Sequence, residues 1–406
     1  MPDKVYYANA VYDHREIKAV NKVLKNHLTL MDGPLVKEFE NKVANIFGKK
    51  HGVMVNSGSS ANLIALAALG LPKGGEVITP ALTFATTVAP IYQCGLIPHF
   101  VDVEHCNFIT NAQHIAQAIN EKTVAIMVPN LLGNVCDWKD IKKIADIHGL
   151  KVIEDCADTI GYKYCDSKDG TTGKYNDLVT TSFYASHIIT AGGQGGMVCT
   201  NNKKLVDKLK LLRGWGRSSA VFNESEAIEK RFNTKVDGID YDSKFIFTDI
   251  GYNFLPSEIS AAFGLEQLKK LSKYKKIRER NFDKLHNFFY SFRELRWLDN
   301  IGQPNAITPW LAYPLVLSDK APFTRKQMQI HFEKNNVQVR TIFTGNITRQ
   351  PVMKNMKWKG DKEFPEADHV MKNGMLVGAH QGMGDKEVNR IQEVFKLLAK
   401  KYKKNA

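Results

Sequence analysis

The sequence predicts an α/β protein with a large domain built on a mixed, mostly parallel sheet and a smaller α/β domain at its C-terminal end. Between residues 50 and 200, short apolar runs alternate with longer stretches of helical periodicity. Several of these runs are continuously apolar, which is typical of strands whose two faces are both covered by helices. The chain has 406 residues, enough for two domains that each have a hydrophobic core.

The predicted elements of the first part of the chain alternate between strands and helices. The strands are 52–55, 76–79, 98–103, 124–129, 151–154, 178–183 and 196–200, and the helices are 60–69, 112–119 and 139–148. This alternation is typical of a parallel sheet. Because ligands bind at the carboxyl ends of the strands in such sheets, the residues that follow each strand are candidate site residues.

A long helix is predicted over residues 257–292, directly after Pro256. We expect one face of it to be solvated, namely the face with Lys269, Lys270, Lys273, Lys275, Lys276, Arg278 and Arg280. The strands predicted beyond it are 310–317 and 337–343, and the helices are 324–335 and 386–400. We therefore predict a large domain with an N-terminal arm over residues 1–265, and a connecting helix and small domain over 266–406. The polar, turn-rich residues 216–245 predict a mobile loop over the site.

The composition is that of an ordinary globular protein, with 43% hydrophobic and 24% charged residues. No apolar run approaches the roughly 18–20 residues of a membrane span, and the first residues lack the apolar stretch of a secretory signal. We expect a cytoplasmic protein without membrane contact. The formal net charge of +14 fits a lysine-rich solvated surface, and it would also attract an anionic ligand such as a nucleotide diphosphate. No nucleic-acid-binding pattern is found, so nucleic acid is not an expected partner.

The cysteines give no sign of a metal site. Six are present, none forms a CxxC pair and none lies beyond Cys199. A zinc ribbon or a disulfide framework is therefore not expected, and buried, reduced thiols are predicted instead.

Residues 56–62 are small or polar, follow a predicted strand and open a predicted helix. Small side chains leave the backbone N–H groups of the first helical turn accessible, and the helix dipole favours a bound phosphate there. The same residues would also form an ordinary N-cap. Taken alone, this segment does not decide between the two interpretations.

Asp155 and Asp158 come just after the predicted strand 151–154. A carboxylate at the end of a strand can pair with a protonated ring nitrogen and keep a pyridinium charged. A helix cap is an equally good interpretation of either residue.

Residues 181–196 are the most informative stretch. A buried strand ends in Ser182, Ser186 and His187 follow, and a glycine-rich return leads into the next strand. Glycine allows positive φ angles and a close approach of the backbone to a ligand.

These three segments, in this order and at this spacing, resemble the DegT/DnrJ/EryC1/StrS group of pyridoxal-phosphate-dependent sugar aminotransferases and dehydratases, which has the fold-type I aminotransferase fold. The resemblance extends from about residue 30 to the last helix. Further matching segments are 30–40, 80–87, 133–134, 213–217 and 251–258. The resemblance implies pyridoxal 5'-phosphate (PLP) or its amine form, pyridoxamine 5'-phosphate (PMP), as the cofactor of the large domain.

The resemblance also implies residues that hold the cofactor phosphate. Ser59 and Ser60, mainly through backbone N–H groups, and the Ser182 hydroxyl would bind it. Asn253 would reach the same phosphate from the partner subunit. This role implies a homodimer with shared active sites.

Three further roles concern the cofactor ring. Phe84 would stack on the pyridine ring, and Asp155 would pair with the ring nitrogen. Asp158 would lie near the ring hydroxyl, where aminotransferases of the family often have glutamine.

Position 187 departs from the aminotransferase pattern. The lysine that bonds covalently to the cofactor is expected there, but the chain has His187, and Lys174 and Lys203 are out of register. Imidazole cannot replace lysine in that bond, although it can act as a general base or acid near neutral pH. The same replacement occurs in the family's two types of 3-dehydrase, which use PMP to remove the 3-hydroxyl of nucleotide-linked 4-keto-6-deoxyhexoses. We therefore predict a lyase of this kind, with His187 and Asp155 as its catalytic residues.

The two types of 3-dehydrase differ in how their cofactor is reduced or regenerated. One, similar to CDP-4-keto-6-deoxyglucose 3-dehydrase, carries an iron–sulfur cluster, and segments 154–156, 213–217 and 345–351 resemble it. Its cluster cysteines would follow Arg217, but residues 218–226 contain no cysteine, so no cluster is expected. The other, similar to GDP-4-keto-6-deoxymannose 3-dehydratase, has no cluster and regenerates PMP from L-glutamate. The missing cysteines favour this second chemistry.

Candidate substrate residues are Arg217, Arg340, Arg349 and His380. Arginine binds phosphate and carboxylate groups with two hydrogen bonds, but ordinary salt bridges would explain Arg340 and Arg349 equally well, and His380 could be a surface histidine. The alternative functions are another lyase or isomerase acting on a nucleotide sugar, a non-catalytic relative that binds a ligand, and a conventional aminotransferase. The resemblance also associates the product with surface polysaccharide biosynthesis.

Overall fold

The computed structural model describes residues 4–26, 29–105, 107–221, 227–299, 301 and 306–403. Its centre is an eight-stranded sheet in the order β1-β8-β7-β5-β4-β2-β3-β14. The strands are β1 (His51–Val55), β2 (Glu76–Pro80), β3 (Ile97–Val101), β4 (Thr123–Pro129), β5 (Lys151–Asp155), β7 (Leu178–Ser182), β8 (Gly196–Thr200) and β14 (Lys359–Gly360). All seven strands predicted in residues 50–200 are present, with ends that shift by one or two residues.

The sheet is parallel except at one strand. β8 runs antiparallel to both of its neighbours, β1 and β7, whereas the pairs from β7 to β14 are all parallel. β7 and β8 are consecutive in the chain and are joined by the short return that contains His187. The predicted mixed, mostly parallel sheet is therefore confirmed.

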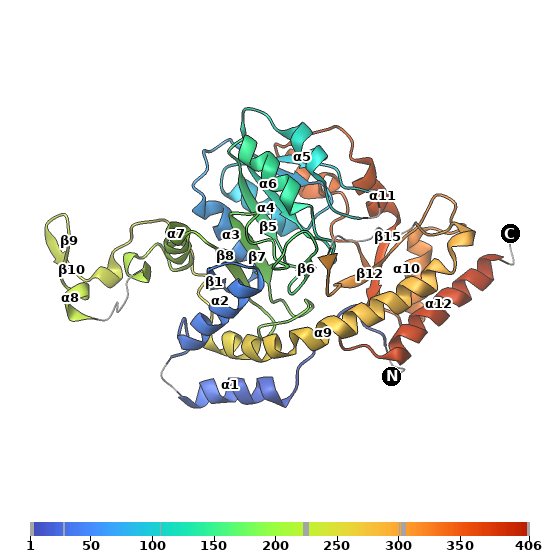
Figure 1. Cartoon of the computed structure of the whole chain (residues 1–406), viewed down its shortest axis with the longest axis horizontal. Coiled ribbons are helices and arrows are strands. Elements are labelled where there is room, and N and C mark those ends of the chain that lie inside the picture. The colour runs from blue at the N-terminus through green and yellow to red at the C-terminus, as the bar shows by residue number, and fades with distance from the viewer. Residues whose placement is uncertain are drawn as a thin grey trace.

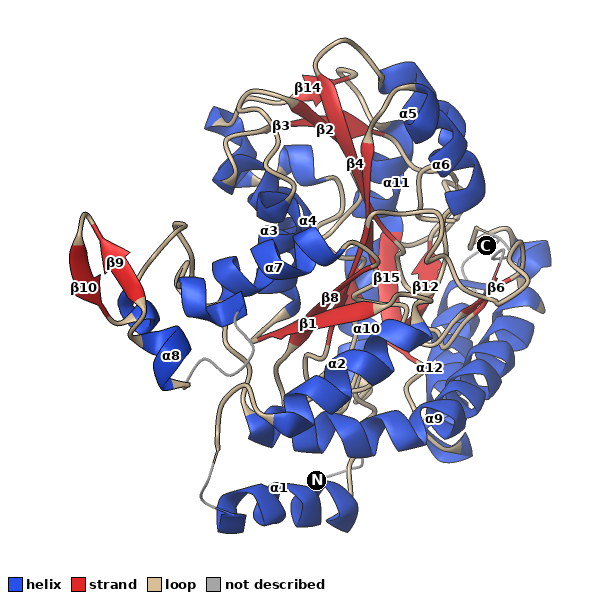
Figure 2. Ribbon diagram, turned by 60° about the vertical axis from the view of Figure 1, so that its left-hand side comes forward, coloured by secondary structure: helices blue, strands red, loops and turns tan. Residues whose placement is uncertain are grey.

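Alternate residues of the strands supply two hydrophobic clusters, one on each face of the sheet. In β4, Ile126 and Val128 belong to the cluster with α2 (Pro34–Ile46) and α6 (Trp138–Ile147). Ala125 and Met127 belong to the cluster with α3 (Gly58–Ala68) and α7 (Lys203–Arg213). The central strands are thus buried on both faces, which explains their continuously apolar sequences. Figure 2 shows helices on both sides of the sheet.

A second, three-stranded antiparallel sheet lies in the C-terminal part, in the order β12-β15-β13. Its strands are β12 (Ala312–Val316), β13 (Arg340–Thr341) and β15 (Gly374–Gly378), and the helices around it are α10 (Arg325–Lys334), α11 (Pro365–Asn373) and α12 (Asp385–Lys403). The strand predicted over 337–343 is reduced to β13 because Asn336 and Phe343 have positive φ angles, which end extended structure on both sides.

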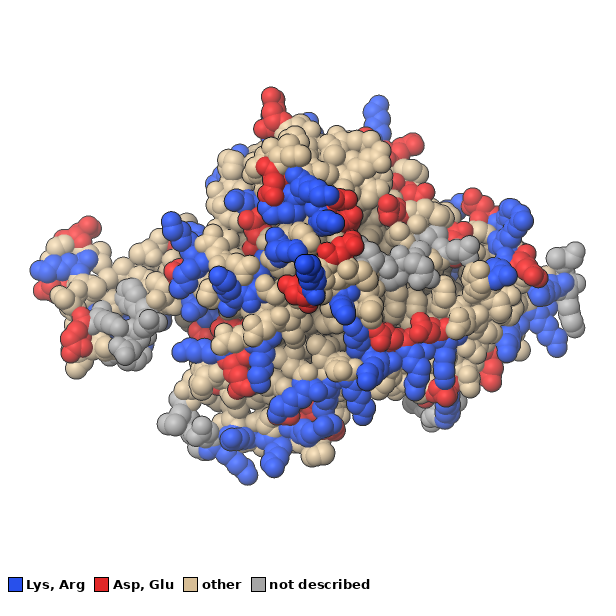
Figure 3. All heavy atoms as spheres, in the orientation of Figure 1, with Lys and Arg blue, Asp and Glu red and all other residues tan. Residues whose placement is uncertain are grey.

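The 33-residue helix α9 (Glu258–Tyr290) connects the two parts (Figure 1). Most of its basic residues are solvated as predicted, and on the face shown in Figure 3 lysine and arginine side chains are interspersed with acidic ones. Lys270 and Arg278 are exceptions, since their exposed fractions are only 5% and 0%. The prediction that all the basic residues of this stretch are solvated is therefore wrong for these two.

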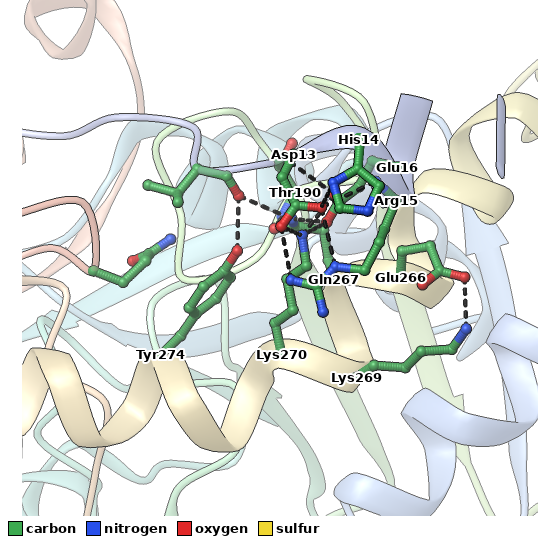
Figure 4. A network of polar contacts seen from close by, with 12 residues as sticks. Asp13, His14, Arg15, Glu16, Thr190, Glu266, Gln267, Lys269, Lys270 and Tyr274 are labelled. Carbon is green, nitrogen blue, oxygen red and sulfur yellow. Dashed lines mark hydrogen bonds and ion pairs between the residues drawn. The ribbon is translucent and has the colours of Figure 1, made fainter. Parts of the chain in front are cut away.

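Lys270 fastens the N-terminal arm to α9 through a buried network (Figure 4). The arm helix α1 (His14–Asn26) lies along α9, and its Glu16 is fully buried. Lys270 Nζ donates to Glu16 Oε2 at 2.6 Å and Gln267 Nε2 donates to Glu16 Oε1 at 2.7 Å. Gln267 Oε1 in turn accepts from the N–H of Thr190, 3.4 Å away in the return between β7 and β8.

Lys270→Met is expected to lower the free energy of unfolding by about 3 kcal/mol, because Glu16 would be left buried without its cation. Lys269→Met is the matched control on the same helix. Lys269 pairs with Glu266 at the surface, and an exposed pair of this kind contributes only about 0–1 kcal/mol. Urea unfolding of both variants measures the difference, and equal losses would contradict the role of the buried pair.

Residues 216–245 do not cover the cavity of their own chain. They contain η1 (Ser218–Val221), α8 (Ile228–Arg231) and a hairpin of β9 (Thr234–Val236) and β10 (Ile239–Tyr241), while residues 222–226 lie outside the described part. Asp237 and Gly238 form the hairpin turn with φ angles of 50° and 82°, as tight hairpin turns require. The segment extends away from the body (Figures 1 and 2), so the predicted loop over the site is wrong for this chain.

The remaining short elements complete the described structure. They are α4 (Ala85–Gln93), α5 (Ala112–Ala118), β6 (Lys163–Tyr164), which pairs with β11 (Ala306–Ile307), and the 3₁₀ turns η2 (Ser243–Phe245), η3 (Arg293–Leu295), η4 (Ile347–Arg349) and η5 (Pro351–Asn355). Within the ranges described above, no helix is long and apolar enough to cross a membrane.

Candidate active site

A cavity of about 600 Å³ opens at the carboxyl ends of the parallel strands. Its wall includes residues that directly follow or end β1, β4, β5 and β7, where the topology of such sheets places ligands. The predicted site residues in its lining are Ser59, Phe84, Asp155, Asp158, Ser182, His187 and Arg340. The sequence analysis missed other lining residues, among them Tyr7, Asn62, Thr87, Asn130 and Gln194.

One end of the cavity is formed by the N-terminus of α3 and by Ser182. Ser57 is the N-cap, and its Oγ accepts from the N–H of Ser60 at 3.1 Å. A Cβ on Gly58 would lie only 2.6 Å from the Cβ of Ser182, so glycine is required for the helix to approach the strand this closely. Ser59 lines the cavity, whereas Ser60 is nearly buried and its N–H is already taken. A bound phosphate would therefore meet Ser59 and Ser182 more directly than Ser60.

Asp155 also lines the cavity, where it is buried and held by three hydrogen bonds. Its Oδ2 accepts from Asn62 Nδ2 at 2.8 Å and from Thr87 Oγ1 at 3.0 Å, and its Oδ1 accepts from the N–H of Ala157 at 3.1 Å. Thr180 Oγ1 donates to Asn62 Oδ1 at 2.5 Å and so fixes the orientation of the amide.

Burial raises the pKa of Asp155, and the hydrogen bonds from Asn62, Ala157 and Thr87 oppose that rise. No lysine, arginine or histidine pairs with it in the part of the chain that the structure describes. A protonated pyridine nitrogen would supply the missing positive charge. The carboxylate therefore fits the ring nitrogen of PLP.

Phe84 supplies a flat surface beside this carboxylate. It is the N-cap residue of α4, makes no side-chain capping bond, and its side chain is 53% exposed on the wall of the cavity. An exposed aromatic face in a cavity is well suited to stacking against another ring. The helix N-terminus, the buried carboxylate and this ring together fit a pyridoxal cofactor.

His187 is carried by the return between β7 and β8. Its N–H donates to the carbonyl of Tyr184 at 3.0 Å, and Gly192, Gly193 and Gly195 have positive φ angles that bring the chain back into β8. Its Nδ1 is 3.7 Å from Oδ1 of Asp158, too far for a hydrogen bond, and has no other partner within the described residues.

Near neutral pH His187 is uncharged, whereas Asp158 is close to the midpoint of its titration. Burial and the charge of Arg278 lower the pKa of His187 to about 4. Burial raises the pKa of Asp158 to about 7, although the N–H of Leu132 donates to its carboxylate at 3.3 Å. The imidazole of His187 is therefore unprotonated at neutral pH, which is the form that a general base requires.

The raised pKa of Asp158 predicts that stability falls as pH rises from about 4 to about 7. In the folded protein this carboxyl binds its proton more tightly than at its ordinary pKa of 3.8, so its contribution to stability is full below about pH 4 and is lost as pH rises through about 7. We expect Asp158→Asn to be more stable than the unsubstituted protein by roughly 2 kcal/mol at pH 8.5. Thermal unfolding without cofactor from pH 4.5 to 8.5 tests this, and an identical pH slope in both proteins would contradict it.

The N-terminal arm brings Tyr7 to the cavity. The backbone N–H of Tyr7 donates to Gln338 Oε1 at 3.0 Å, and Val5 forms a parallel bridge with Val337. The guanidinium of Arg340 lies 5.9 Å from the centre of the Tyr7 ring. Burial and the nearby Asp158 raise the pKa of Tyr7, which keeps its hydroxyl protonated. No sequence pattern links Tyr7 to His187, since their proximity depends on how the arm is attached.

Five predicted residues, Ser60 among them, lie outside the lining of this cavity. Asn253 is exposed and its backbone pairs with Gly214. Arg217 lies against the rings of Trp215, Phe245 and Phe247, at 4.8, 5.6 and 5.8 Å from their centres. Their contacts with cofactor phosphate and substrate stay predictions.

Arg349 and His380 make contacts within the chain. Arg349 is paired with Asp368 at the surface through two hydrogen bonds, the salt bridge that was the alternative to substrate binding. His380 is buried, so the alternative of a surface histidine is wrong. Its Nδ1 accepts from the N–H of Gly382 at 3.2 Å, and Nε2 lies 3.2 Å from the carbonyl of Tyr6. Both nitrogens are thus occupied.

The cysteines and acidic residues form no metal site within the described residues, where no group of three or more metal-ligating side chains is found. Of the described cysteines, Cys136, Cys156 and Cys199 are buried free thiols, as predicted, whereas Cys165 is exposed.

The fold and this cavity define a protein of the PLP-dependent aminotransferase fold. The chain matches the DegT/DnrJ/EryC1/StrS aminotransferase family over residues 11–396, and it belongs to this family. The predicted family and fold are therefore confirmed. Together with the fit of the cavity, membership supports the predicted PLP or PMP cofactor.

Known relatives include nucleotide-sugar 3-dehydratases. The chain is 34% identical to dTDP-4-dehydro-2,6-dideoxy-D-glucose 3-dehydratase of Saccharopolyspora spinosa, over 90% of this chain and 80% of that protein. It is 31% identical to GDP-4-keto-6-deoxy-D-mannose 3-dehydratase of Yersinia pseudotuberculosis, over 96% and 97% of the two chains. A crystal structure of GDP-4-keto-6-deoxymannose-3-dehydratase with a trapped PLP-glutamate geminal diamine superposes with a TM-score of 0.85 at 28% identity, covering 96% of this chain and 99% of that one.

Proposed function

We propose that this protein is a PLP/PMP-dependent nucleotide-sugar 3-dehydratase, a lyase that removes the 3-hydroxyl of a nucleotide-linked 4-keto-6-deoxyhexose. The observation that carries the proposal is the position of His187. An uncharged imidazole lines the cavity at the place where the family's aminotransferases carry lysine, while Asp155, Ser182 and Phe84 surround the same cavity. The relatives named as 3-dehydratases support the same reaction class.

When bound, PMP would supply an amine for the keto carbon of the sugar and a ring that holds the electron pair left by loss of a proton, the pair that expels the hydroxyl at carbon 3. His187 would take the proton from the aminomethyl carbon of the cofactor, and this proton can leave with the hydroxyl as water. Asp155 would hold the ring nitrogen protonated. Ser59 and Ser182 would bind the phosphate, and Phe84 would cover one face of the ring.

We propose L-glutamate as the amino donor that regenerates PMP. The relative with a trapped PLP-glutamate adduct supports this assignment. No cysteine occurs in residues 218–226, so an iron–sulfur cluster after Arg217 would lack ligands. Arg340, which lines the cavity, is the best placed of the candidate arginines to meet a carboxylate or phosphate.

We also propose a homodimer with shared active sites, in which Asn253 contributes to the partner's cofactor phosphate. Asn253 is exposed and does not line the cavity of its own chain. The extended segment that includes α8 and β10 exposes Ile228 by 70%, Phe232 by 54% and Ile239 by 67%. A second copy of the chain would cover such apolar side chains. Light scattering of the purified protein measures the oligomeric state.

The experiment that tests the function is spectroscopic and chemical. The absorbance of the purified protein is recorded with PLP and again after L-glutamate, and nucleotide 4-keto-6-deoxy sugars are then analysed by mass spectrometry. We expect conversion of PLP to PMP, followed by a 3-deoxy 4-keto product with one oxygen atom fewer than the sugar supplied, because the water lost at carbon 3 is balanced by the water that releases the amine while PMP returns to PLP. Transfer of an amino group to the sugar would instead indicate an aminotransferase. Another dehydrated or rearranged product would indicate a different lyase or an isomerase. An unchanged sugar would indicate a relative that only binds ligands.

A further inference from the structure

A buried arginine lies directly behind His187. Arg278 is in the middle of α9, and its side chain is fully buried. Its Nη1 donates to the carbonyls of Trp310 and Leu311 at 2.8 and 2.9 Å, and its Nη2 lies 3.5 Å from the carbonyl oxygen of His187. A guanidinium that is withdrawn from water needs several acceptors, and here backbone carbonyls provide them.

Gln381 completes this arrangement. Its Oε1 accepts from Arg278 Nε at 2.6 Å, and its Nε2 donates to the carbonyl of Ile188 at 3.1 Å. Arg278 and Gln381 therefore hold two consecutive peptide groups of the return that carries His187. They also tie this return to the segment 310–311, of which Leu311 lines the cavity.

The charge of Arg278 is not neutralised by a carboxylate. Within the described residues, no aspartate or glutamate forms an ion pair with it. In a water-excluded site, an uncompensated charge acts strongly on neighbouring ionisable groups. His187 and His380 both have their pKa lowered to about 4, first by burial and then by Arg278.

Below about pH 7 the other groups around His187 do not offset this charge. Asp158 faces its Nδ1 at 3.7 Å, but burial raises the pKa of Asp158 to about 7 and so favours its uncharged form. The Tyr184 ring lies 6.1 Å from the imidazole. Tyr7, whose pKa is raised, and Arg340 line the same cavity from the arm and from β13.

We propose that Arg278, together with Gln381, is a positioning residue for His187 and places an uncompensated positive charge behind its imidazole. This inference rests on the proposed function, in which His187 is the base. A base must be uncharged before it takes a proton and must be held within reach of the carbon that loses it. Arg278 meets both needs without contacting the substrate or the cofactor.

The charge and the hydrogen bonds of Arg278 can be separated by three substitutions. Gln381→Glu keeps an acceptor for Arg278 Nε and adds a negative charge beside the guanidinium, but it also removes the N–H donor to the Ile188 carbonyl. Arg278→Met removes the charge and the hydrogen bonds, whereas Arg278→Lys keeps the charge with fewer bonds. Lys276→Met, which removes an exposed charge from the same helix, is the matched control.

The measurement is the protonation of the His187 imidazole by NMR of protein labelled at histidine Cε1, with PMP added to saturation. His187→Asn identifies the signal. We expect His187 to stay uncharged between about pH 5.5 and 8 in the unsubstituted protein, in Arg278→Lys and in Lys276→Met. In Gln381→Glu and Arg278→Met its midpoint should rise from about 4 by roughly one pH unit or more, the usual effect of changing a nearby charge, so the titration is followed down to about pH 4.

Unchanged titration of His187 in Gln381→Glu would overturn the proposal, as would a shift in Arg278→Lys as large as that in Arg278→Met. If Arg278→Met does not fold, the titration of His187 in Gln381→Glu tests the proposal alone, because glutamate preserves the shape of the side chain. The titration does not depend on dehydration. A protein that leaves every sugar unchanged would therefore refute the proposed function, while the NMR result would still test the proposed role of Arg278. In an active enzyme, Gln381→Glu should lower kcat more at pH 6 than at pH 8, with little change in KM.

Discussion

Replacing His187 by asparagine is expected to lower the rate of sugar dehydration by about 10²–10⁴-fold, the usual contribution of a positioned general base. Asparagine has a similar size and polarity but cannot accept the proton. Binding of PLP should be nearly unchanged, because Asp155, Ser182 and Phe84 remain in place. Single-turnover measurements on the PMP form with the sugar that the unsubstituted protein dehydrates give the rate, and a cofactor titration gives the affinity.

His187→Lys sharpens this test by changing the chemistry of the same position. A lysine amine at this place should bond covalently to PLP, so that borohydride reduction attaches the cofactor to the protein, and dehydration should fall. The control is His380→Asn, which alters a buried histidine that does not line the cavity. Full dehydratase turnover in either His187 variant would remove this residue from the mechanism.

The sheet could be predicted from the sequence because its strands are buried on both faces. Residues such as Ala125–Val128 contact one hydrophobic cluster or the other in alternation, so every position is apolar and the strand stands out from its polar flanks. The strand predicted over 337–343 is longer than the observed β13 for a local reason, since Asn336 and Phe343 on either side have positive φ angles. Apolar content does not reveal such turns at residues other than glycine.

The site could be predicted where it follows strands, and not where it depends on long-range contacts. Asp155, Ser182 and His187 come at or just beyond the ends of β5 and β7 and were found. Tyr7 reaches the cavity through contacts of the arm with distant segments, namely with Gln338 and, through Glu16, with Lys270 of α9.

Arg278 shows a second reason why the sequence does not predict every residue around the site. In the sequence it is one of many basic residues of a helix with exposed lysines, and its periodicity gives no sign that it is buried. Its partners are backbone carbonyls of residues 187, 310 and 311, which have no side-chain signature. A buried cation with backbone acceptors therefore cannot be distinguished from a solvated one until the fold is known.

Asp155→Ala is expected to lower dehydration by at least about 10²–10³-fold, since an electrostatic contact that stabilises developing charge is worth that much. Without the carboxylate, nothing among the groups around Asn62 and Thr87 can keep the ring nitrogen protonated, because they are neutral hydrogen-bond donors. The smaller alanine side chain also leaves space for a methyl group on the ring nitrogen of the cofactor. Transient kinetics with PMP measures the loss.

A PMP analogue methylated at the ring nitrogen separates this role from a structural one, because its ring carries a fixed positive charge that needs no proton. The analogue should restore a large part of the rate in Asp155→Ala, and should not raise the rate of Asp158→Asn, whose ring-nitrogen partner is intact. If the analogue gave no recovery in a folded Asp155→Ala protein that binds it, Asp155 would act by shaping the cavity. If Asp155→Ala kept its full rate with PMP, the charge on the ring would have to be stabilised elsewhere, and the assignment of the buried carboxylate to the ring nitrogen would fail.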